Sequence, residues 1–405
     1  MSADGATLRQ DVRVIGLVGV GHGVSHFYQL ILPPLFPLMK DDLGVSYAAL
    51  GLTVAVYYTV SGACQFLAGF AVDRFGARRV LFCGLALCVL GALLAGLSRG
   101  YDMLLLASVI GGLGNSVFHP SDFAILNARV NTARLGYAFS WHGIAGFIGY
   151  AAAPGFAVGI AAAWGWHGAL VVAAALGTVF LAAAWYLRDD LYAEPASRAL
   201  APGHSLADDF RVLASTPVLM CFFYFVLVSV AFIAMQGFGV STLVSLFGMP
   251  VAMASGALSM YLLASAFGIF AGGFVATRTS RHNIVAATGV AVSAACVLTV
   301  ALVPMPVAAV PFVLASAGFC AGLTNPSRDL IVRQTTPPGS TGKVYGFVYS
   351  GIDVGSMIMP VIFGWMLDVH QPRGVLLAMV AALVLTIATV LTLPTRPVKL
   401  GAQPR

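Results

Sequence analysis

The sequence predicts an all-α membrane protein with twelve transmembrane helices in two pseudo-symmetric six-helix bundles. Of the 405 residues, 59% are hydrophobic and only 9% are charged, and the mean hydropathy is +0.92. This composition excludes a soluble globular protein of this length. About twelve apolar runs reach the roughly 20 residues that a helix needs to cross a bilayer, and the two halves of the chain repeat each other.

The apolar runs set the expected spans in order. In the first half they cover 12–38, 46–72, 80–98, 102–128, 136–161 and 166–187. In the second half they cover 217–246, 251–275, 284–303, 306–333, 341–367 and 373–393. An extended polar stretch separates the two sets. We therefore expect an N-terminal bundle over 1–187, a cytoplasmic linker over 188–216 and a C-terminal bundle over 217–405.

Lys and Arg residues are distributed unevenly among the predicted loops. Seventeen of them fall on one side, whereas the other side holds only Lys40, Arg99 and Arg373. Because basic loops stay cytoplasmic, both termini should be cytoplasmic in a multi-pass protein of the inner membrane. The net charge of +6 reflects this bias and does not indicate nucleic-acid binding. The first apolar run is too long for a cleavable signal peptide.

Short segments of the first half recur in the second. Gly-Phe-Ala-Val-Asp-Arg at 69–74 is matched by Gly-Phe-Val-Ala-Thr-Arg at 273–278, and His-Pro-Ser-Asp at 119–122 by Asn-Pro-Ser-Arg at 325–328. The offsets, 204 and 206 residues, are nearly constant, which indicates a duplicated six-helix unit. Transporters built from such repeats place their substrate between the halves, near the bilayer midplane.

The loop that follows the second predicted span carries the most specific motif. Its pattern, G-x-x-x-D-R-x-G-x-R-R, is formed by Gly69, Asp73, Arg74, Gly76, Arg78 and Arg79. The two glycines permit close helix approach and a tight reversal. The string resembles the signature loop between helices two and three of the major facilitator superfamily of secondary transporters. We therefore expect a conformational hinge in which Asp73 is needed for switching between transport states. The alternative is that Asp73 is a loop acid that only helps to set topology.

Polar residues inside predicted spans are few, and charge at that depth indicates function by default. The candidates for a substrate and proton pathway are His22, His26, Gln29, His119, Asp122, His142, Arg328, Asp329 and Asp353. Instead of lining a pathway, each histidine could be a core residue that hydrogen-bonds a neighbouring helix. Asp353 could instead be a local packing partner for a hydroxyl group. The i, i+4 spacing of His22 and His26 also suits zinc. The sequence shows no dense supply of carboxylates and thiols to complete such a site, so we expect no metal and no cofactor.

Two further stretches narrow the resemblance. Ser25-His26 and Gln29-Leu30-Ile31-Leu32 lie in the first span, and Gly-Leu-Gly-Asn-Ser-Val-Phe-His-Pro occupies 112–120 in the fourth. Together they resemble the fosmidomycin-resistance branch of the superfamily, whose members resemble proton-driven drug exporters. The chain departs from that branch where Ser121 separates the His-Pro pair from Asp122. It also has Ser108 where many proton-coupled exporters carry an Arg.

The resemblance implies a secondary active transporter, with proton-coupled efflux of a drug or metabolite by antiport and alternating access as the leading hypothesis. The alternative is a proton-coupled uptake symporter for a small organic anion, and a metal or metal-chelate transporter is the least favoured. No nucleophile or phosphate-binding loop indicates an enzyme. The expected partners are a small-molecule substrate, protons and the lipid bilayer, with no nucleic acid, and the protein should be monomeric.

Asp122 and Arg328 occupy equivalent positions in the two repeats, 206 residues apart. We expect them to face each other across a central cleft and to pair when its cytoplasmic side closes. The alternative is that Arg328 pairs within its own half or binds an anionic substrate.

Overall fold

The computed structural model describes residues 8–193, 212–335 and 341–392, and this part of the chain contains helices and loops but no strand. Eleven helical segments within it are long and apolar enough to cross a membrane. The prediction of an all-α membrane protein is therefore confirmed. Most of the predicted linker, residues 194–211, and the ends of the chain lie outside the described residues.

The helices follow the predicted spans closely. Those of the first half are α1 (Leu8–Leu30), α2 (Phe36–Leu43), α3 (Tyr47–Phe75), α4 (Ala77–Gly96), α5 (Tyr101–Asn115), α6 (Phe118–Arg129) and α7 (Leu135–Tyr186). Those of the second half are α9 (Thr216–Gln236), α10 (Gly239–Phe247), α11 (Val251–Arg278), α12 (His282–Leu302), α13 (Val310–Thr335), α14 (Thr341–Asp368) and α15 (Pro372–Thr392).

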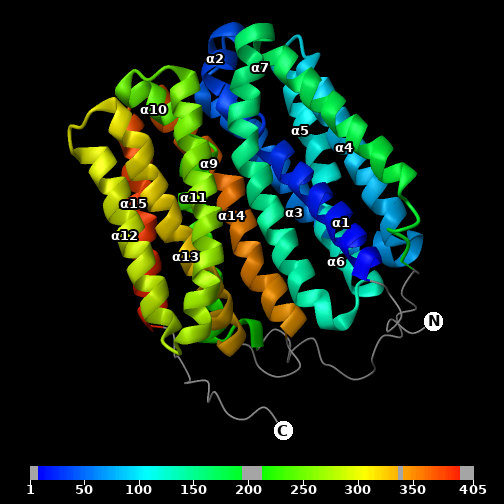
Figure 1. The fold of residues 1–405 in the computed structure, drawn as a ribbon. Coiled ribbons are helices and arrows are strands. Elements are labelled where there is room, and N and C mark those ends of the chain that lie inside the picture. Colours follow the sequence, from blue (N-terminus) through cyan, green and yellow to red (C-terminus); the bar gives the residue numbers. More distant parts are fainter. Residues whose placement is uncertain (1–7, 194–211, 336–340, 393–405) are drawn as a thin grey trace.

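Two expected spans, 136–161 and 166–187, join in the single long element α7. Its 52 residues would measure about 78 Å if straight, more than twice the thickness of a bilayer core. The element is not straight, because Gly165 adopts φ 68° and ψ 174°, outside the helical region. Figure 1 shows its two parts as separate rods that meet at the top of the view. A glycine takes this backbone conformation without the strain that a side chain would add.

The expected span 102–128 is divided into α5 and α6 at Ser116 and Val117. The break lies four residues before Pro120, whose ring clashes with the carbonyl of residue i−4 in a continuous helix. Ser116 stabilises the break, since its hydroxyl donates a hydrogen bond to the Leu113 carbonyl. Pro120 therefore accounts for the break, and His119 and Asp122 lie in the first turns of the second piece, α6.

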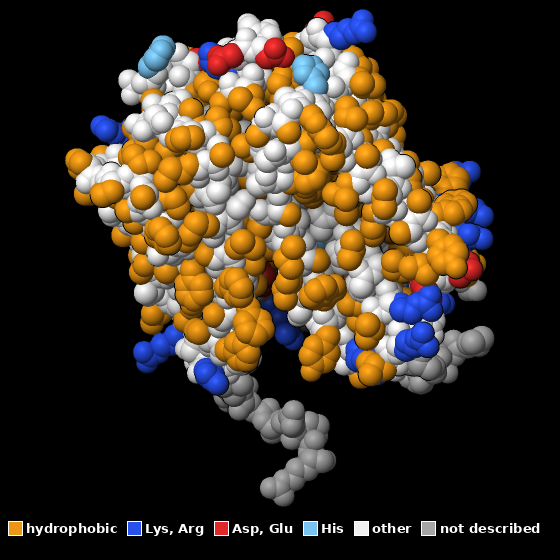
Figure 2. All heavy atoms as spheres, turned by 45° about the horizontal axis from the view of Figure 1, so that its top comes forward, with side chains coloured by type: hydrophobic (Ala, Val, Ile, Leu, Met, Phe, Trp, Pro, Cys, Tyr) orange, Lys and Arg blue, Asp and Glu red, His pale blue; other side chains and the backbone are white. Residues whose placement is uncertain are grey.

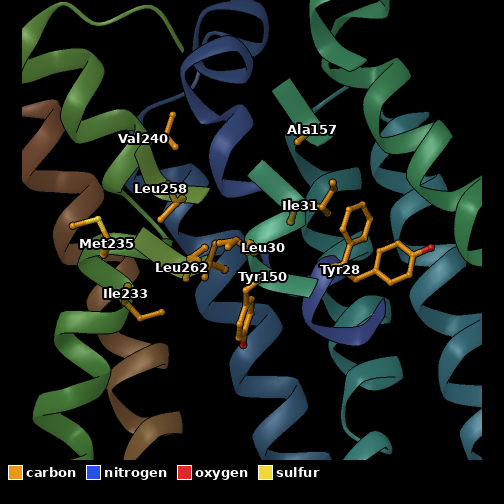
Figure 3. Close-up of a cluster of buried hydrophobic side chains, with 14 of the residues drawn as sticks. Tyr28, Leu30, Ile31, Tyr150, Ala157, Ile233, Met235, Val240, Leu258 and Leu262 are labelled. Carbon is orange, nitrogen blue, oxygen red and sulfur yellow. The ribbon is translucent and has the colours of Figure 1, made fainter. Parts of the chain in front are cut away.

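The helices pack in two groups, with α1 and α3–α7 in one and α9 and α11–α15 in the other (Figure 1). Between the groups, α3 packs against α14 and α7 packs against α11. A buried apolar core joins them: Leu30 of α1 and Tyr150 of α7 lie near Leu258 and Leu262 of α11 (Figure 3). Figure 2 shows a broad hydrophobic surface between charged side chains at the two ends, as expected for contact with lipid.

A polar contact closes one end of the boundary between the groups. The carboxylate of Asp368, at the end of α14, accepts hydrogen bonds from the backbone N–H groups of Tyr47 (2.8 Å) and Ala48 (2.9 Å) at the start of α3. Nearby, a Cβ on Gly51 would lie 2.2 Å from the Pro360 carbonyl oxygen, so the two backbones approach closely. At the opposite end, Figure 2 shows a cleft between the two groups.

Candidate functional site

Five ionisable side chains predicted separately from the sequence converge in the first group of helices. They are His22 and His26 of α1, His119 and Asp122 of α6, and His142 of α7. Two glycine contacts bring the helices together: a Cβ on Gly149 would lie 2.0 Å from the Gly23 carbonyl oxygen, and one on Gly146 would lie 2.7 Å from His26 Nδ1. The cluster therefore depends on the close packing of α1 against α7 as much as on its own residues.

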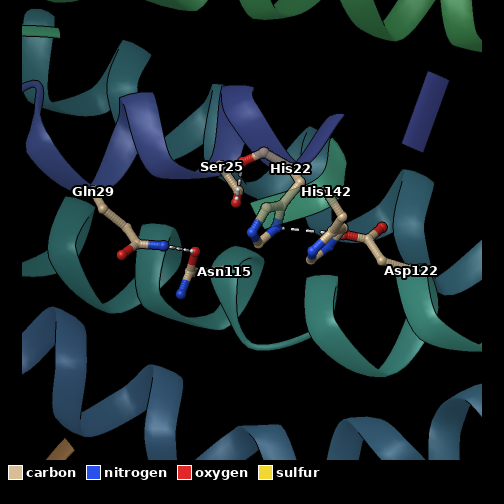
Figure 4. Close-up of polar contacts among 6 residues, drawn as sticks. All are labelled: His22, Ser25, Gln29, Asn115, Asp122 and His142. Carbon is tan, nitrogen blue, oxygen red and sulfur yellow. Dashed lines mark hydrogen bonds and ion pairs between the residues drawn. The ribbon is translucent and has the colours of Figure 1, made fainter. Parts of the chain in front are cut away.

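Asp122 is the centre of this cluster. Its side chain is fully buried, and its Oδ2 lies 3.0 Å from His142 Nε2 and 3.5 Å from His22 Nδ1 (Figure 4). The shorter contact is a hydrogen bond, which His142 donates when the carboxylate is ionised. The imidazoles of His22 and His142 stack with centroids 3.6 Å apart and planes inclined by 19°. The other oxygen, Oδ1, has no hydrogen-bond partner.

His26 and His119 extend the cluster toward less buried positions. The centroid of the His22 ring lies 4.3 Å from that of His26 and 5.2 Å from that of His119. Both outer histidines are only partly buried, unlike His22. Proton-binding groups therefore form a continuous series from the fully buried Asp122 to partly exposed imidazoles. Such a series can pass or store a proton without leaving a charge isolated in the membrane.

A second polar series lies beside the histidines and includes residues that the sequence did not single out for a site. The Gln29 amide donates to Asn115 Oδ1 (2.9 Å), and Asn115 in turn donates to the Ser61 hydroxyl (2.8 Å). The Tyr150 hydroxyl donates to Gln29 Oε1 (2.6 Å), and its ring lies 4.2 Å from that of His26. The sequence offered little reason to assign Asn115 and Tyr150 to a functional site, because uncharged polar residues are common at helix contacts within membranes.

The second group of helices holds a separate charged cluster. Arg328 Nε donates to Asp329 Oδ1 (2.9 Å), and the guanidinium also reaches Asn325 Oδ1 (3.3 Å). Its cation lies 4.9 Å from the centroid of the Phe225 ring, and Tyr349 donates to Asp329 (3.0 Å). In the described part of the chain, therefore, Arg328 pairs within its own group of helices.

The expected pair between Asp122 and Arg328 is not formed in this structure, since each has partners in its own group of helices. Asp353 lies apart from both, on the α14 face that meets α3, where a Cβ on Gly62 would be 3.2 Å from its carboxyl carbon. The predicted pathway residues thus divide into the histidine cluster, Gln29 in the polar series beside it, the Arg328 cluster and Asp353.

The predicted hinge joins α3 to α4. Gly76 supplies the tight reversal, with φ 86° and ψ 139°. Arg78 contacts the start of the polar stretch that follows α7, since it lies 3.4 Å from Asp189 Oδ1 and donates to the Arg188 carbonyl (3.1 Å). Gly69 does not serve close helix approach in this structure, because a Cβ there would meet no atom within 4 Å. The motif therefore ties the α3–α4 loop to the end of the first group.

Comparison with known proteins agrees with this architecture. The family model described as Major Facilitator Superfamily matches residues 18–254 and 234–405. The "Fosmidomycin resistance protein" of Escherichia coli (strain K12) is 25% identical over 292 residues, which is 68% of each chain. The "Hexuronate transporter" of Bacillus subtilis (strain 168) is 25% identical over 358 residues, or 82% of each chain. Matches to several other relatives span less than half of those proteins.

Solved structures show the same fold. A bacterial homolog of the human lysosomal transporter Spinster, in an inward-facing and occupied conformation, superposes with a TM-score of 0.78 at 14% identity, covering 95% of this chain and 97% of that one. The nucleoside transporter NupG gives a TM-score of 0.76 at 16% identity, covering 94% of this chain and 99% of that one.

Proposed function

Since the chain belongs to the major facilitator superfamily, we propose that it is a proton-coupled exporter of a small organic drug or metabolite. The family consists of secondary transporters of small molecules in membranes and not of enzymes. In the proposed mechanism the protein exchanges protons for substrate by alternating access. The single observation that carries the proposal is the cluster of four histidines around the buried Asp122.

The proposed architecture counts α7 as two spans on either side of Gly165, which makes twelve helices from the eleven long apolar segments. Six helices then belong to a bundle over 1–187 and six to a bundle over 217–405, joined by the linker 188–216. In this arrangement the protein is a monomer of the inner membrane with both termini cytoplasmic. The basic hinge residues from Arg74 to Arg79 would lie at the cytoplasmic surface.

Proton binding is assigned to Asp122 together with its histidine neighbours. A buried carboxylate without a counter-ion is costly, and His142 and His22, both within 3.5 Å of Asp122 Oδ2, are the neighbours that can exchange a proton with it. His119 and His26, which are partly exposed, supply the route by which that proton exchanges with solvent. Movement of α1 against α6 and α7 would change these contacts and so couple proton release to conformation.

Substrate binding is assigned to the space beside this cluster. The amides of Gln29 and Asn115 and the hydroxyl of Tyr150 offer neutral donors and acceptors from α1, α5 and α7. Substrate contact there would disturb the ring contact between Tyr150 and His26, which links substrate to the proton site. In this scheme the Asp73 motif acts as the hinge and does not contact substrate.

The alternative is a proton-coupled uptake symporter for a small organic anion. Two observations favour it: Arg328 presents a partly exposed cation in the second group of helices, and one relative is named a hexuronate transporter. Against it, Asp329 and Asn325 already partner that guanidinium. Transport of metals or metal chelates is the least favoured of the three proposed functions.

Everted membrane vesicles with an imposed pH gradient distinguish export from uptake. Addition of fosmidomycin should release protons from acid-loaded vesicles if the protein is a proton antiporter for this class of compound. If the protein is instead an uptake symporter, added glucuronate, a hexuronate, should enter the vesicles together with protons and cause no proton release. We expect Asp122→Asn to abolish proton release while exchange of labelled for unlabelled substrate continues, because the substrate contacts remain. Asp102→Asn, at an exposed position on α5, is the matched control.

Gradient-driven transport that survives both in Asp122→Asn and in His119→Ala would contradict the assignment of the proton site. Equal loss of proton release in the Asp102→Asn control would show that the effect is not specific to the cluster.

A further inference from the structure

Three imidazoles from two helices meet at one point of the histidine cluster. His22 and His26 lie one turn apart on α1, and His119 reaches them from α6. One potential ligand atom from each lies within 4.8 Å of the others. We propose that His22, His26 and His119 bind a divalent transition-metal ion. Asp122 does not contact the ion but orients the His22 ring through its Nδ1 atom. This proposal goes beyond the proposed transport function and does not depend on it.

The ring geometry is close to that of a tetrahedral site. With metal–nitrogen distances of about 2.0–2.1 Å, tetrahedral ligand atoms lie about 3.3 Å apart and the imidazole centroids about 5 Å apart. The observed centroid separations are 4.3 Å for His22 and His26 and 5.2 Å for His22 and His119. The ring planes are inclined by 53° and 67°, so His22 is stacked on neither His26 nor His119. Small side-chain rotations of the partly buried His26 and His119 would bring the ligand atoms to bonding distance.

Unpartnered buried atoms point to the same site. His22 Nδ1 is buried without a hydrogen bond and lies 3.5 Å from Asp122 Oδ2. His26 Nδ1 and Asp122 Oδ1 are also buried without hydrogen-bond partners. Histidines that ligate metals through one nitrogen usually donate the other N–H to a carboxylate, a backbone carbonyl or water. A cation on His22 Nε2 would strengthen that donation to Asp122 and would compensate its buried negative charge.

A second possible ligand set, His22, Asp122 and His142, fits a metal less well. Its ligand atoms also lie within 4.8 Å of one another. However, the rings of His22 and His142 are stacked, with planes inclined by only 19° and centroids 3.6 Å apart. Because a metal binds in the plane of an imidazole, one ion cannot lie in both of these planes. Asp122 and His142 are therefore assigned to support His22 rather than to contact the ion.

The chemistry of the donors defines the class of ion. Neutral imidazole nitrogens suit Zn²⁺, Co²⁺, Ni²⁺ and Cu²⁺, whereas Mg²⁺ and Ca²⁺ prefer oxygen ligands. Within one helix, His22 and His26 offer only two of the nitrogens that such an ion needs. The tertiary structure adds His119 as the third nitrogen and Asp122 as the supporting carboxylate.

The test is metal binding by the full chain in detergent, purified through a tag that contains no histidine. Isothermal titration should give one Zn²⁺ bound per chain, and Mg²⁺ should not compete. We expect His26→Gln and His119→Gln to weaken binding at least tenfold by removal of a ligand. Asp122→Asn should weaken it roughly 10- to 100-fold, as for other carboxylates that support ligating histidines. His370→Gln, at an exposed position far along the chain, is the matched control.

X-ray absorption of the zinc-loaded wild-type protein gives a result that does not depend on how well a variant folds. Three imidazole nitrogens around the ion would support the site, and one imidazole or none would overturn it. The proposal is also overturned if no saturable Zn²⁺ binding occurs or if His119→Gln binds as tightly as the His370→Gln control. Inhibition of proton-driven transport by Zn²⁺ is expected in addition. That readout depends on the proposed function, whereas the binding measurements do not.

Discussion

Removal of one carboxylate oxygen of Asp368 should loosen the closed end of the boundary between the two groups of helices. In the structure this carboxylate accepts hydrogen bonds from the backbone N–H groups of Tyr47 and Ala48 at the start of α3. Asp368→Asn keeps one acceptor and turns an N–H₂ group toward the other backbone N–H. A hydrogen bond to a charged group contributes about 1.5–3 kcal/mol. Because Asp368 is partly exposed, we take about 2 kcal/mol, equivalent to a change of roughly 30-fold in the opening equilibrium.

Hydrogen exchange followed by mass spectrometry measures this change directly. In Asp368→Asn, the amides in the first turns of α3 and in the facing end of α14 near Pro360 should exchange about 30-fold faster. The matched control is Asp42→Asn, because Asp42 lies at the same end but accepts a hydrogen bond from Trp166 Nε1 within one group of helices (2.9 Å). That control should leave exchange at the boundary unchanged.

Two results would refute the reasoning about Asp368. Exchange within threefold of the wild-type rate would show that the carboxylate does not hold the two groups together. Faster exchange at Tyr47 and Ala48 alone, with α14 unchanged, would show that Asp368 only caps α3 and does not control the contact between the groups.

Two further changes test the packing and the hinge. Gly149→Ala should destabilise the protein by about 1–3 kcal/mol and lower its Tm, because the new methyl group would lie 2.0 Å from the Gly23 carbonyl oxygen. Gly143→Ala, on the same helix with no atom within 4 Å of the new methyl group, should leave the Tm unchanged. Equal Tm values in the two variants would show that the close contact of Gly149 with Gly23 does not limit side-chain size. Asp73→Asn should bind substrate with wild-type affinity but transport at least tenfold more slowly, and wild-type transport rates would exclude a hinge role for Asp73.

Local sequence features were sufficient for the fold class and for most helix bounds. The length of an apolar run and the position of Pro and Gly act within one segment. They therefore predicted the reversal at Gly76 and the extent of spans such as 251–275, which the structure places in α11, Val251–Arg278. They did not separate the pieces α9 and α10 within the expected span 217–246, because both pieces are apolar.

The candidate site was predicted only as separate residues. The i, i+4 spacing placed His22 with His26 on one face of a helix, and His119 lies three residues before Asp122 in the sequence. Spacing along the chain gave no reason to place His142 of α7 against either pair, and the repeat suggested Arg328 as the partner of Asp122 instead. Asn115 and Tyr150 carry no charge, so nothing in their local sequence distinguished them from residues that only pack.

Hydrophobic run length and the scarcity of charge are properties of the chain before it folds, so they are enough to predict a multi-pass, all-α membrane protein. Which of the buried polar groups meet depends instead on how the helices pack. The close contact of Gly23 with Gly149 brings α1 against α7, and that contact allows His142 to stack on His22 beside Asp122. Contacts between helices depend on the shapes of both surfaces, and a pattern read along one helix does not contain that information.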